Sequence, residues 1–329
     1  MVHLLRKLAI VLLSLVCVTL FYFTIHSGSR VLKSDWELPQ TAEKVDTKQR
    51  LVLITQELET PFWDKVAIGA MEEAKKESAS LEVWGSYGYN QDDFLKKIEI
   101  AIYSQVDGII LQGLDTDEFK ALTKIKAASY GIPIITVAND VPMGESLRKS
   151  HVGSDQYIAG KMIGEQLLSD MGTEGEVAVM VDIQHQYFQE QRLEGIRQVL
   201  EEYPNIQIHY IEMHDSREQV IATTKDVLNR NPNLDAFIVI NAEVLAAMIQ
   251  EIERRSQIEP YFIYSFDDDY EAISLLNQGK IDGIIEQSPE EMGKMSVKLI
   301  LQWLNNEEFP LDLDGYQTDI RIVKAKEER

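Results

Sequence analysis

Two aromatic residues, Phe62 and Trp63, follow a strand and a short turn, at a place where α/β proteins commonly bind ligands. The run Leu51 to Ile54 is apolar without polar alternation, which is typical of a central parallel strand covered by helices on both faces. Thr60 offers a capping hydroxyl, and Pro61 suits the first turn of a helix. Because open parallel sheets hold ligands at the carboxyl ends of their strands, this pattern predicts that Phe62 and Trp63 lie at a binding site.

The other residues that could perform chemistry form no catalytic or metal-binding pattern. Cys17 is the only cysteine, and the six histidines show no metal-ligand spacing. Asp267 and Asp268 could act as an acid and a base, and with Asp269 they resemble a cation site, but the spacing lacks a calcium-loop pattern. The sequence also contains no nucleophile elbow, dinucleotide fingerprint or phosphate-binding loop. We therefore expect no catalytic residues, no metal and no cofactor.

Composition bounds the size and the partners of the protein. A chain of 329 residues with 45% hydrophobic content can bury two medium-sized cores, so two domains are expected. The formal net charge of -22 argues against binding nucleic acid or anionic lipid. This charge says little about a small ligand, because acidic residues on helix faces are most often solvated surface.

The amino terminus has the pattern of a signal anchor. Arg6 and Lys7 precede Leu8 to Ile25, an uncharged apolar stretch of 18 residues, which is at the lower limit for a membrane-spanning helix. The residues at the end of this stretch are bulky, which favours an uncleaved anchor over a signal peptide with a small-residue cleavage site. The cysteine in the stretch lacks the preceding small residue that lipid attachment needs. We expect a cytoplasmic start and anchor at 1–26, a polar stalk at 27–48 and an exported body.

The body alternates between apolar runs and helix-period segments. The expected strands are 51–54, 81–84, 108–111, 132–137 and 151–155 in a first series, and 177–181, 206–211, 236–240, 261–266 and 281–285 in a second. Alternation at this spacing implies right-handed crossovers and parallel strands. The sequence therefore predicts an α/β fold with two successive doubly wound parallel sheets.

Seven segments carry a resemblance to a known family. In order they are TPFW at 60–63, VDGIIL at 106–111, GIPIITVANDVP at 131–142, HVGSDQYIAGK at 151–161, RLEGI at 192–196, SFDD at 265–268 and QGKIDGIIEQSPEEMG at 278–293. Together they resemble the type I periplasmic binding proteins, specifically the ribose-binding branch. That resemblance implies two lobes joined by three hinge crossings, which close on a small ligand. It places 49–154 plus 287–314 in lobe 1, and 155–286 plus 315–329 in lobe 2.

The resemblance also assigns roles to aromatic and basic residues. Phe62 and Trp63 would cover the apolar faces of a sugar ring, unless one of them packs beneath the first helix. Arg192 matches an arginine that donates two hydrogen bonds to adjacent ring oxygens. The alternative is a helix-face arginine paired with Glu190 or Glu194.

Three further polar residues match family contacts at strand ends. Asn241 would offer a donor and an acceptor to sugar hydroxyls, and Asp267 would accept from two hydroxyls. Either could instead cap the helix that follows. Gln287 would supply a final amide contact or act only in the hinge.

The sequence departs from the ribose-binding pattern after the fourth strand. Ala138 and Asn139 stand where that branch has adjacent Asp and Arg, and Asp140 follows. Losing the second arginine removes a bidentate donor, which argues against ribose itself. We include Asn139 and Asp140 among the expected ligand-binding residues.

These observations predict a membrane-anchored extracytoplasmic protein that binds a sugar or similar polyol. It would serve the permease of an ABC-type uptake system, or present its ligand to a sensor histidine kinase. The alternative is a sugar-responsive transcription repressor, which shares this fold. That alternative needs an amino-terminal helix-turn-helix, whereas this chain has an apolar span there.

Overall fold

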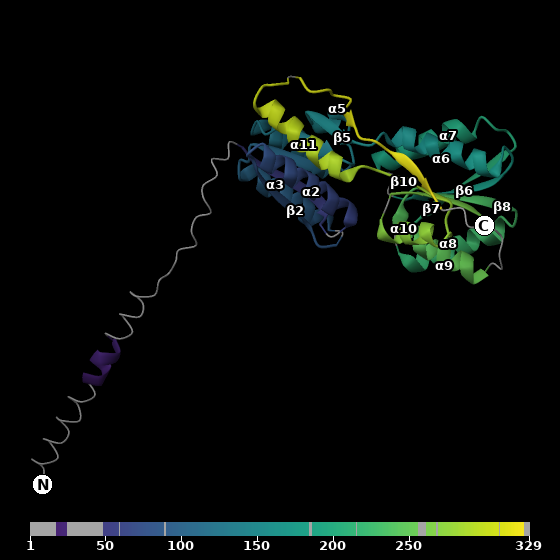
Figure 1. The fold of residues 1–329 in the computed structure, drawn as a ribbon, viewed down its shortest axis with the longest axis horizontal. Coiled ribbons are helices and arrows are strands. Elements are labelled where there is room, and N and C mark those ends of the chain that lie inside the picture. Colours follow the sequence, from purple (N-terminus) through teal and green to yellow (C-terminus); the bar gives the residue numbers. More distant parts are fainter. Residues whose placement is uncertain are drawn as a thin grey trace, which may run out of the picture. The chain divides into compact units, whose positions relative to one another are not determined.

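The computed structural model describes most of the chain beyond residue 48 (Figure 1). The described residues are 18–24, 49–58, 60–88, 90–183, 186–214, 216–255, 261–267, 269–308 and 310–325. Within these ranges no helix has both the length and the apolar character needed to cross a membrane. The expected anchor at 1–26 lies largely outside the described residues, as does the whole expected stalk at 27–48. Thr47–Arg329 forms a compact unit of its own.

A first six-stranded sheet is built from early strands and one late strand, in the order β11-β5-β4-β3-β1-β2. The strands are β1 (Arg50–Glu57), β2 (Ser80–Ser86), β3 (Gly108–Gln112), β4 (Ile134–Val137), β5 (Ser150–Gly153) and β11 (Tyr316–Gln317). All neighbours in this sheet are parallel. Its helices are α2 (Pro61–Lys76), α3 (Gln91–Tyr103), α4 (Asp117–Ala121), the π-helix η1 (Leu122–Ala127), α5 (Met143–Ser146) and α11 (Pro289–Leu304). Apolar side chains form two clusters with these helices, so the first lobe has its own core.

A second six-stranded sheet repeats this layout in the order β12-β10-β9-β8-β6-β7. Its strands are β6 (Gly175–Asp182), β7 (Ile206–Met213), β8 (Leu234–Val239), β9 (Phe262–Phe266), β10 (Gly283–Glu286) and β12 (Arg321–Lys324). The helices are α6 (Gln156–Met171), α7 (Tyr187–Leu200), α8 (Arg217–Arg230), the short η2 (Ala242–Val244), α9 (Leu245–Arg255) and α10 (Tyr270–Asn277). Two further apolar clusters fill this lobe. The expected α/β fold with two doubly wound lobes is confirmed.

The ends of the two sheets differ from the expectation in two details. The described chain passes between the sheets three times: after β5, between β10 and α11, and after β11. We expected 315–329 to belong to lobe 2, but β11 pairs with β5, and Thr318 N–H extends this pairing to the Gly153 carbonyl at 2.9 Å. β12 is antiparallel to β10, because the short connection from β11 delivers the chain to the end of β10 at Glu286.

Close helix contacts fix α2 against α11 in the first lobe and α6 against α7 in the second. Gly69 of α2 lies against the Glu290 backbone of α11, and Gly160 of α6 lies against the Arg192 backbone of α7. A Cβ at either glycine would overlap a backbone carbonyl oxygen, so only glycine permits this approach. The α6–α7 contact therefore sets the position of Arg192.

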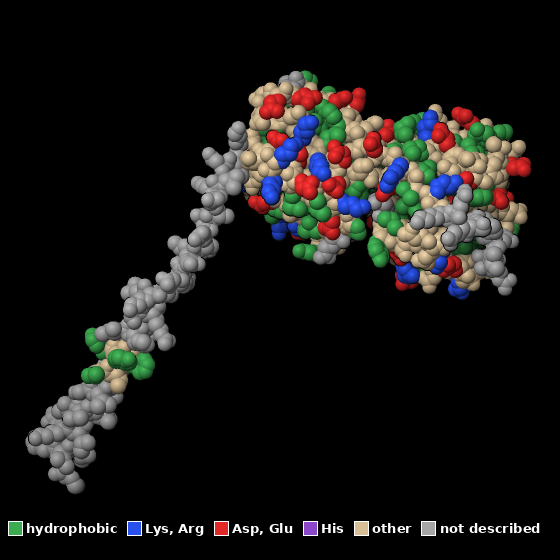
Figure 2. All heavy atoms as spheres, in the orientation of Figure 1, with side chains coloured by type: hydrophobic (Ala, Val, Ile, Leu, Met, Phe, Trp, Pro, Cys, Tyr) green, Lys and Arg blue, Asp and Glu red, His purple; other side chains and the backbone are tan. Residues whose placement is uncertain are grey.

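Acidic side chains are spread over the visible face of the body rather than gathered in one patch (Figure 2). Lys and Arg side chains lie among them on the same face. On this face the charged residues are therefore interspersed, as expected for solvated helix faces.

Candidate ligand-binding site

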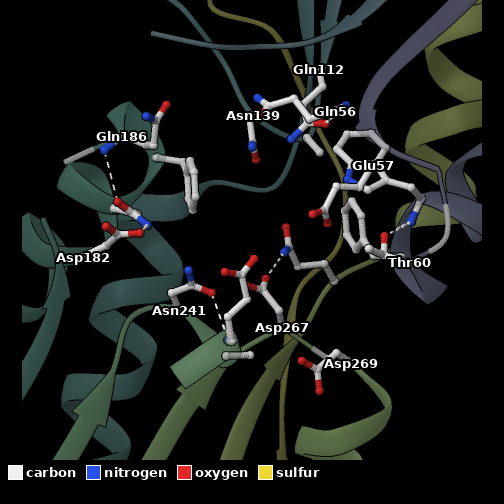
Figure 3. A pocket seen from close by; sticks show the side chains of 18 of the residues that line it. Gln56, Glu57, Thr60, Gln112, Asn139, Asp182, Gln186, Asn241, Asp267 and Asp269 are labelled. Atoms are coloured by element: carbon white, nitrogen blue, oxygen red, sulfur yellow. Dashed lines mark hydrogen bonds between the residues drawn. The ribbon is translucent and has the colours of Figure 1, made fainter. Parts of the chain in front are cut away.

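A cavity of about 450 Å³ lies where the carboxyl ends of strands from both sheets meet (Figure 3). It is lined by residues that follow β1, β3 and β4 in the first lobe, and β6, β8 and β9 in the second. Seven of the eight residues expected from the sequence line it: Phe62, Trp63, Asn139, Arg192, Asn241, Asp267 and Gln287. The structure therefore brings together side chains that are far apart in the sequence.

Arg192 is the buried cation of the cavity, with 2% of its side chain exposed. Its Nη1 and Nη2 atoms donate to the two carboxylate oxygens of Asp267, at 3.0 and 2.9 Å. Nη1 also donates to the Ile240 carbonyl at 2.9 Å, and Nε donates to Gln156 Oε1 at 2.8 Å. These bonds occupy four of the five N–H groups of a guanidinium, so one Nη2 N–H is not used by the described residues. The alternative pairing with Glu190 or Glu194 is not the one observed.

Asp267 and Gln287 extend this network toward the hinge. Asp267 has a φ of 69°, in the left-handed region that few residues other than glycine adopt. Gln287 Nε2 donates to Asp267 Oδ1 at 2.6 Å, and Gln287 Oε1 accepts from Gln156 Nε2 at 3.2 Å. Asp269, rather than Asp267, caps α10 through a 2.6 Å bond from the Ala272 N–H. Asp267 is therefore oriented by Arg192 and Gln287 and not by capping.

Asn241 serves as a helix cap and also lines the cavity. Its Oδ1 accepts from the Glu243 N–H at 3.1 Å, at the start of η2. The two N–H groups of its amide are not used by this bond. The expected capping and ligand-binding roles are thus geometrically compatible.

The aromatic residues lie on both lobes. Phe62 and Trp63 meet edge to face, with ring centroids 5.3 Å apart. Trp63 is 8% exposed and belongs to the core of the first lobe, whereas Phe62 is half-buried. From the second lobe, the Phe188 ring lies 5.1 Å from the Arg192 guanidinium carbon and also lines the cavity. Flat apolar surfaces are therefore available from each lobe.

Asp140 is the expected residue that does not line the cavity. Its two carboxylate oxygens each accept a 2.7 Å hydrogen bond from Arg148, and Oδ1 also accepts from Thr136 Oγ1 at 2.6 Å. His151 Nδ1 lies 3.4 Å from the same oxygen. Because these partners hold the carboxylate inside the first lobe, Asn139 lines the cavity and its neighbour Asp140 does not.

Several lining residues were not singled out from the sequence: Glu57, Gln112, Asp182, Gln186, Phe188 and Gln189. Gln112 and Asp182 are the last residues of β3 and β6, and parallel sheets hold ligands at such strand ends. Phe188 and Gln189 precede Arg192 by four and three residues on α7, which is the spacing of one helix face. Both signals were present in the sequence.

Comparison with known proteins identifies the family. The family model for the periplasmic binding protein domain matches residues 51–308. The ribose import binding protein of Escherichia coli K12 is 22% identical over 270 residues, covering 81% of this chain and 90% of that protein. The glucose-galactose binding protein GanP of Geobacillus stearothermophilus has 28% sequence identity and a TM-score of 0.78, over 85% of this chain and 98% of GanP. The structure of the XylFII–LytSN complex contains a chain with 25% identity and a TM-score of 0.72, over 84% of this chain and 98% of that one.

The chain therefore belongs to the periplasmic binding protein family, because the model spans most of its length. Its fold is that of the type I members, and the resemblance to the ribose-binding branch is confirmed. The matched relatives are named as binding proteins rather than enzymes, which agrees with the binding role expected from the sequence.

Proposed function

We propose that this protein binds a sugar or small polyol outside the cytoplasm and closes its two lobes around it. The observation that carries the proposal is the Arg192–Asp267–Gln287 network on a cavity lined by Phe62 and Phe188. The named ligands of relatives, ribose for one and glucose and galactose for another, support the ligand class. The family's periplasmic name supports the location.

Each part of the network suits one part of a polyol. The oriented carboxylate of Asp267 can accept from hydroxyls, and the remaining Nη2 N–H of Arg192 can donate to a ring or hydroxyl oxygen. The amide of Asn241 can donate in the same way, while Phe62 and Phe188 can cover the C–H faces. Because these groups come from both lobes, a bound polyol would stabilise the closed arrangement over the open one. We propose the seven expected residues that line the cavity as ligand contacts.

The proposal includes the organisation expected from the sequence. The apolar stretch Leu8 to Ile25 supports an uncleaved anchor followed by a stalk. Lobe 1 would comprise 49–154, 287–314 and β11, and lobe 2 would comprise 155–286 and the chain from residue 319 onward. Membrane fractionation of the native protein, with and without a carbonate wash, tests the anchor.

Two downstream uses are proposed, and each has support. Similarity to an import binding protein favours delivery to an ABC-type permease. Similarity to XylFII, a protein solved in complex with LytSN, favours presentation to a membrane sensor such as a histidine kinase. A fixed anchor would limit shuttling and therefore favours the sensor.

Thermal unfolding against monosaccharides and inositols tests binding itself. A ligand at 100 times its dissociation constant should stabilise the protein by about 2.7 kcal/mol, a shift of several degrees in Tm. The Asn241→Ala variant should bind more weakly, and because Asn241 is partly exposed this variant is expected to fold. The proposal fails if no compound at millimolar concentration raises Tm.

Deletion of the gene separates the two uses. If the protein delivers sugar, uptake of labelled sugar should be lost even when the transporter genes are expressed from a constitutive promoter. If it reports sugar, uptake should persist in that background, and induction of the native promoter should be lost.

A further inference from the structure

The cavity has a surplus of negative charge among its described residues. Five carboxylates line it, and Arg192 is the one described cation there. The carboxylates belong to Glu57, Asp182, Glu243, Asp267 and Asp269. A ligand that carries a carboxylate or a phosphate would meet this field unfavourably, since like charges close together in a site of reduced water content repel strongly.

Arg192 does not offset this surplus. Both of its Nη atoms already bind the carboxylate of Asp267, so this guanidinium and this carboxylate compensate one another. The remaining carboxylates must therefore be balanced by other groups. Asp182 accepts from Gln189 Nε2 at 3.2 Å, and Asp269 caps α10. Glu243 also has partners within the protein.

Glu57 differs from the other four carboxylates, because its carboxylate has no partner among the described residues. It stands at the end of β1, on the lobe opposite Arg192 and Asp267, and lines the cavity (Figure 3). An ionised carboxylate that loses water on closure costs free energy unless a cation or several donors replace that water. Lobe closure around a ligand would impose this cost on Glu57.

The backbone places Glu57 there through an irregularity in β1. Thr55 pairs with Gly85 and Glu57 pairs with Ser86, so Gln56 is an extra residue in the ladder. Successive residues of a regular strand point to opposite faces, whereas a bulge redirects a side chain. Here both Gln56 and Glu57 line the cavity.

Two buried amides accompany Glu57. Gln56 is 6% exposed, and its side-chain amide has no partner among the described residues. Gln112 is 8% exposed, and its Oε1 accepts from the Gln56 backbone N–H at 2.8 Å, which leaves its NH₂ group for the cavity. The free amide groups of Gln56 and Gln112 face the cavity rather than being enclosed in the core, so they can hydrogen-bond to a polar ligand on this side. The first lobe therefore offers amide donors for hydroxyls and one carboxylate.

We infer that the ligand is an amino sugar or amino polyol, whose ammonium group is held by the Glu57 carboxylate. This inference rests on the proposed function and names its ligand class. The hydroxyls on one edge meet Asp267, Arg192 and Asn241, while the ammonium on the opposite edge meets Glu57. The ammonium neutralises the carboxylate that closure would otherwise leave without water or a partner.

Isothermal titration calorimetry on the purified full chain tests the inference with matched pairs. The probes are D-glucose with D-glucosamine and D-galactose with D-galactosamine, at a pH where the amine is protonated, together with N-acetyl-D-glucosamine and D-glucuronate. In at least one pair the amino sugar should bind about tenfold tighter than its parent, a difference of about 1.4 kcal/mol. The acetylated and acidic probes should lose that gain, because neither carries a cation.

Two substitutions complete the test. The Glu57→Gln variant keeps the size and polarity of the side chain, and it should reduce the ratio of amino-sugar to parent affinity to near one. Glu82→Gln removes an exposed carboxylate of the same lobe outside the cavity and should leave the ratio unchanged. Parent sugars that bind at least as well as their amino partners would overturn the inference and leave the proposed function standing. Absence of binding by every probe at millimolar concentration would overturn the inference, and absence of any shift in the thermal panel of monosaccharides and inositols as well would overturn the proposed function.

Discussion

The two lobes present the same backbone framework to the cavity but different charges. Beyond a register shift at Glu176, the pairing of β6 with β8 follows that of β1 with β3, and the contacts of α7 with α6 follow those of α2 with α11. Val66 of α2 is the counterpart of Arg192 of α7. The backbone carbonyl of each residue faces a glycine in the helix that packs against its own helix. Ala138 is the counterpart of Asp267, and both have left-handed φ values, 62° and 69°. The second lobe thus holds an ion pair where the first holds two small apolar residues.

Other counterparts keep their chemistry. Phe62 and Phe188 occupy equivalent positions one turn before Val66 and Arg192, and both line the cavity. Both lobes therefore supply an aromatic surface at the same position, whereas the charged residues at the other equivalent positions occur in the second lobe only. The difference teaches that the fold specifies where ligand contacts lie, and that the side chains at a few equivalent positions specify what they bind.

The largest expected effect comes from breaking the ion pair of the second lobe. Asp267→Ala leaves the buried Arg192 guanidinium without its carboxylate, and we expect the free energy of unfolding to fall by roughly 3–5 kcal/mol. The double variant Arg192→Val with Asp267→Ala installs the residues of the first lobe. It should recover most of the stability but bind no sugar. Chemical denaturation and calorimetry measure both, and a double variant as unstable as the single one would contradict the correspondence.

One helix contact in each lobe offers a substitution with a smaller effect. Gly160→Ala and Gly69→Ala each force a methyl group against a backbone carbonyl, and each should destabilise the protein by roughly 1–3 kcal/mol. Only the first displaces α7 and Arg192, so Gly160→Ala should also weaken sugar binding. Gly69→Ala should lower Tm by a similar amount, but its Kd should rise less, because α2 carries Phe62 and Trp63 but neither Arg192 nor Asp267. Equal losses of affinity in the two variants would show that Arg192 is not set by the α6–α7 contact.

The asparagines of the two lobes should separate binding from stability. Asn139→Ala removes a side chain with no partner among the described residues, so we expect Kd to rise by about threefold to tenfold without a change in Tm. Asn241→Ala removes the cap of η2 as well, and both Kd and Tm should respond. Unchanged affinity in Asn139→Ala would remove Asn139 from the site.

The smallest expected effect is a pH dependence confined to the first lobe. Burial lowers the pKa of His151 below its usual 6.5, against the opposing field of Asp140 and with the support of Arg148. The unfolded chain then takes up a proton at a higher pH than the folded protein does. Stability is retained above pH 6.5 and is lost as pH falls from there toward the folded-state pKa. Thermal melts should show a loss of about 1 kcal/mol or less between pH 7.5 and 5.5.

His151→Gln should remove this part of the pH dependence. His209→Gln in the second lobe is the matched substitution, and its melting curve should keep the dependence. The same slope in all three proteins would show that His151 is not its source.

The sequence by itself determined where the strands and helices lie, and it indicated most of the residues expected at the cavity. Continuous apolar runs such as Leu51 to Ile54 can be covered on both faces only in a parallel sheet, so strand ends and their polar residues share one edge. The predicted helix cap at Thr60 is also confirmed, because its hydroxyl accepts a hydrogen bond from the Trp63 N–H at 3.3 Å. Asn241 and Asp267 were expected as ligand contacts because each follows a strand and matches a contact of the ribose-binding branch.

The tertiary structure decided which of two neighbours faces the cavity and which residues are already paired. Asn139 and Asp140 are adjacent and equally polar, but the partners Arg148, Thr136 and His151 draw Asp140 into the lobe. Similarly, the carboxylate that binds Arg192 comes from the end of β9, on another element of the fold. Hydrogen bonds of this kind depend on distance in space, which spacing along the chain does not encode. For the same reason, spacing along the chain does not reveal that the Glu57 carboxylate has no partner among the described residues.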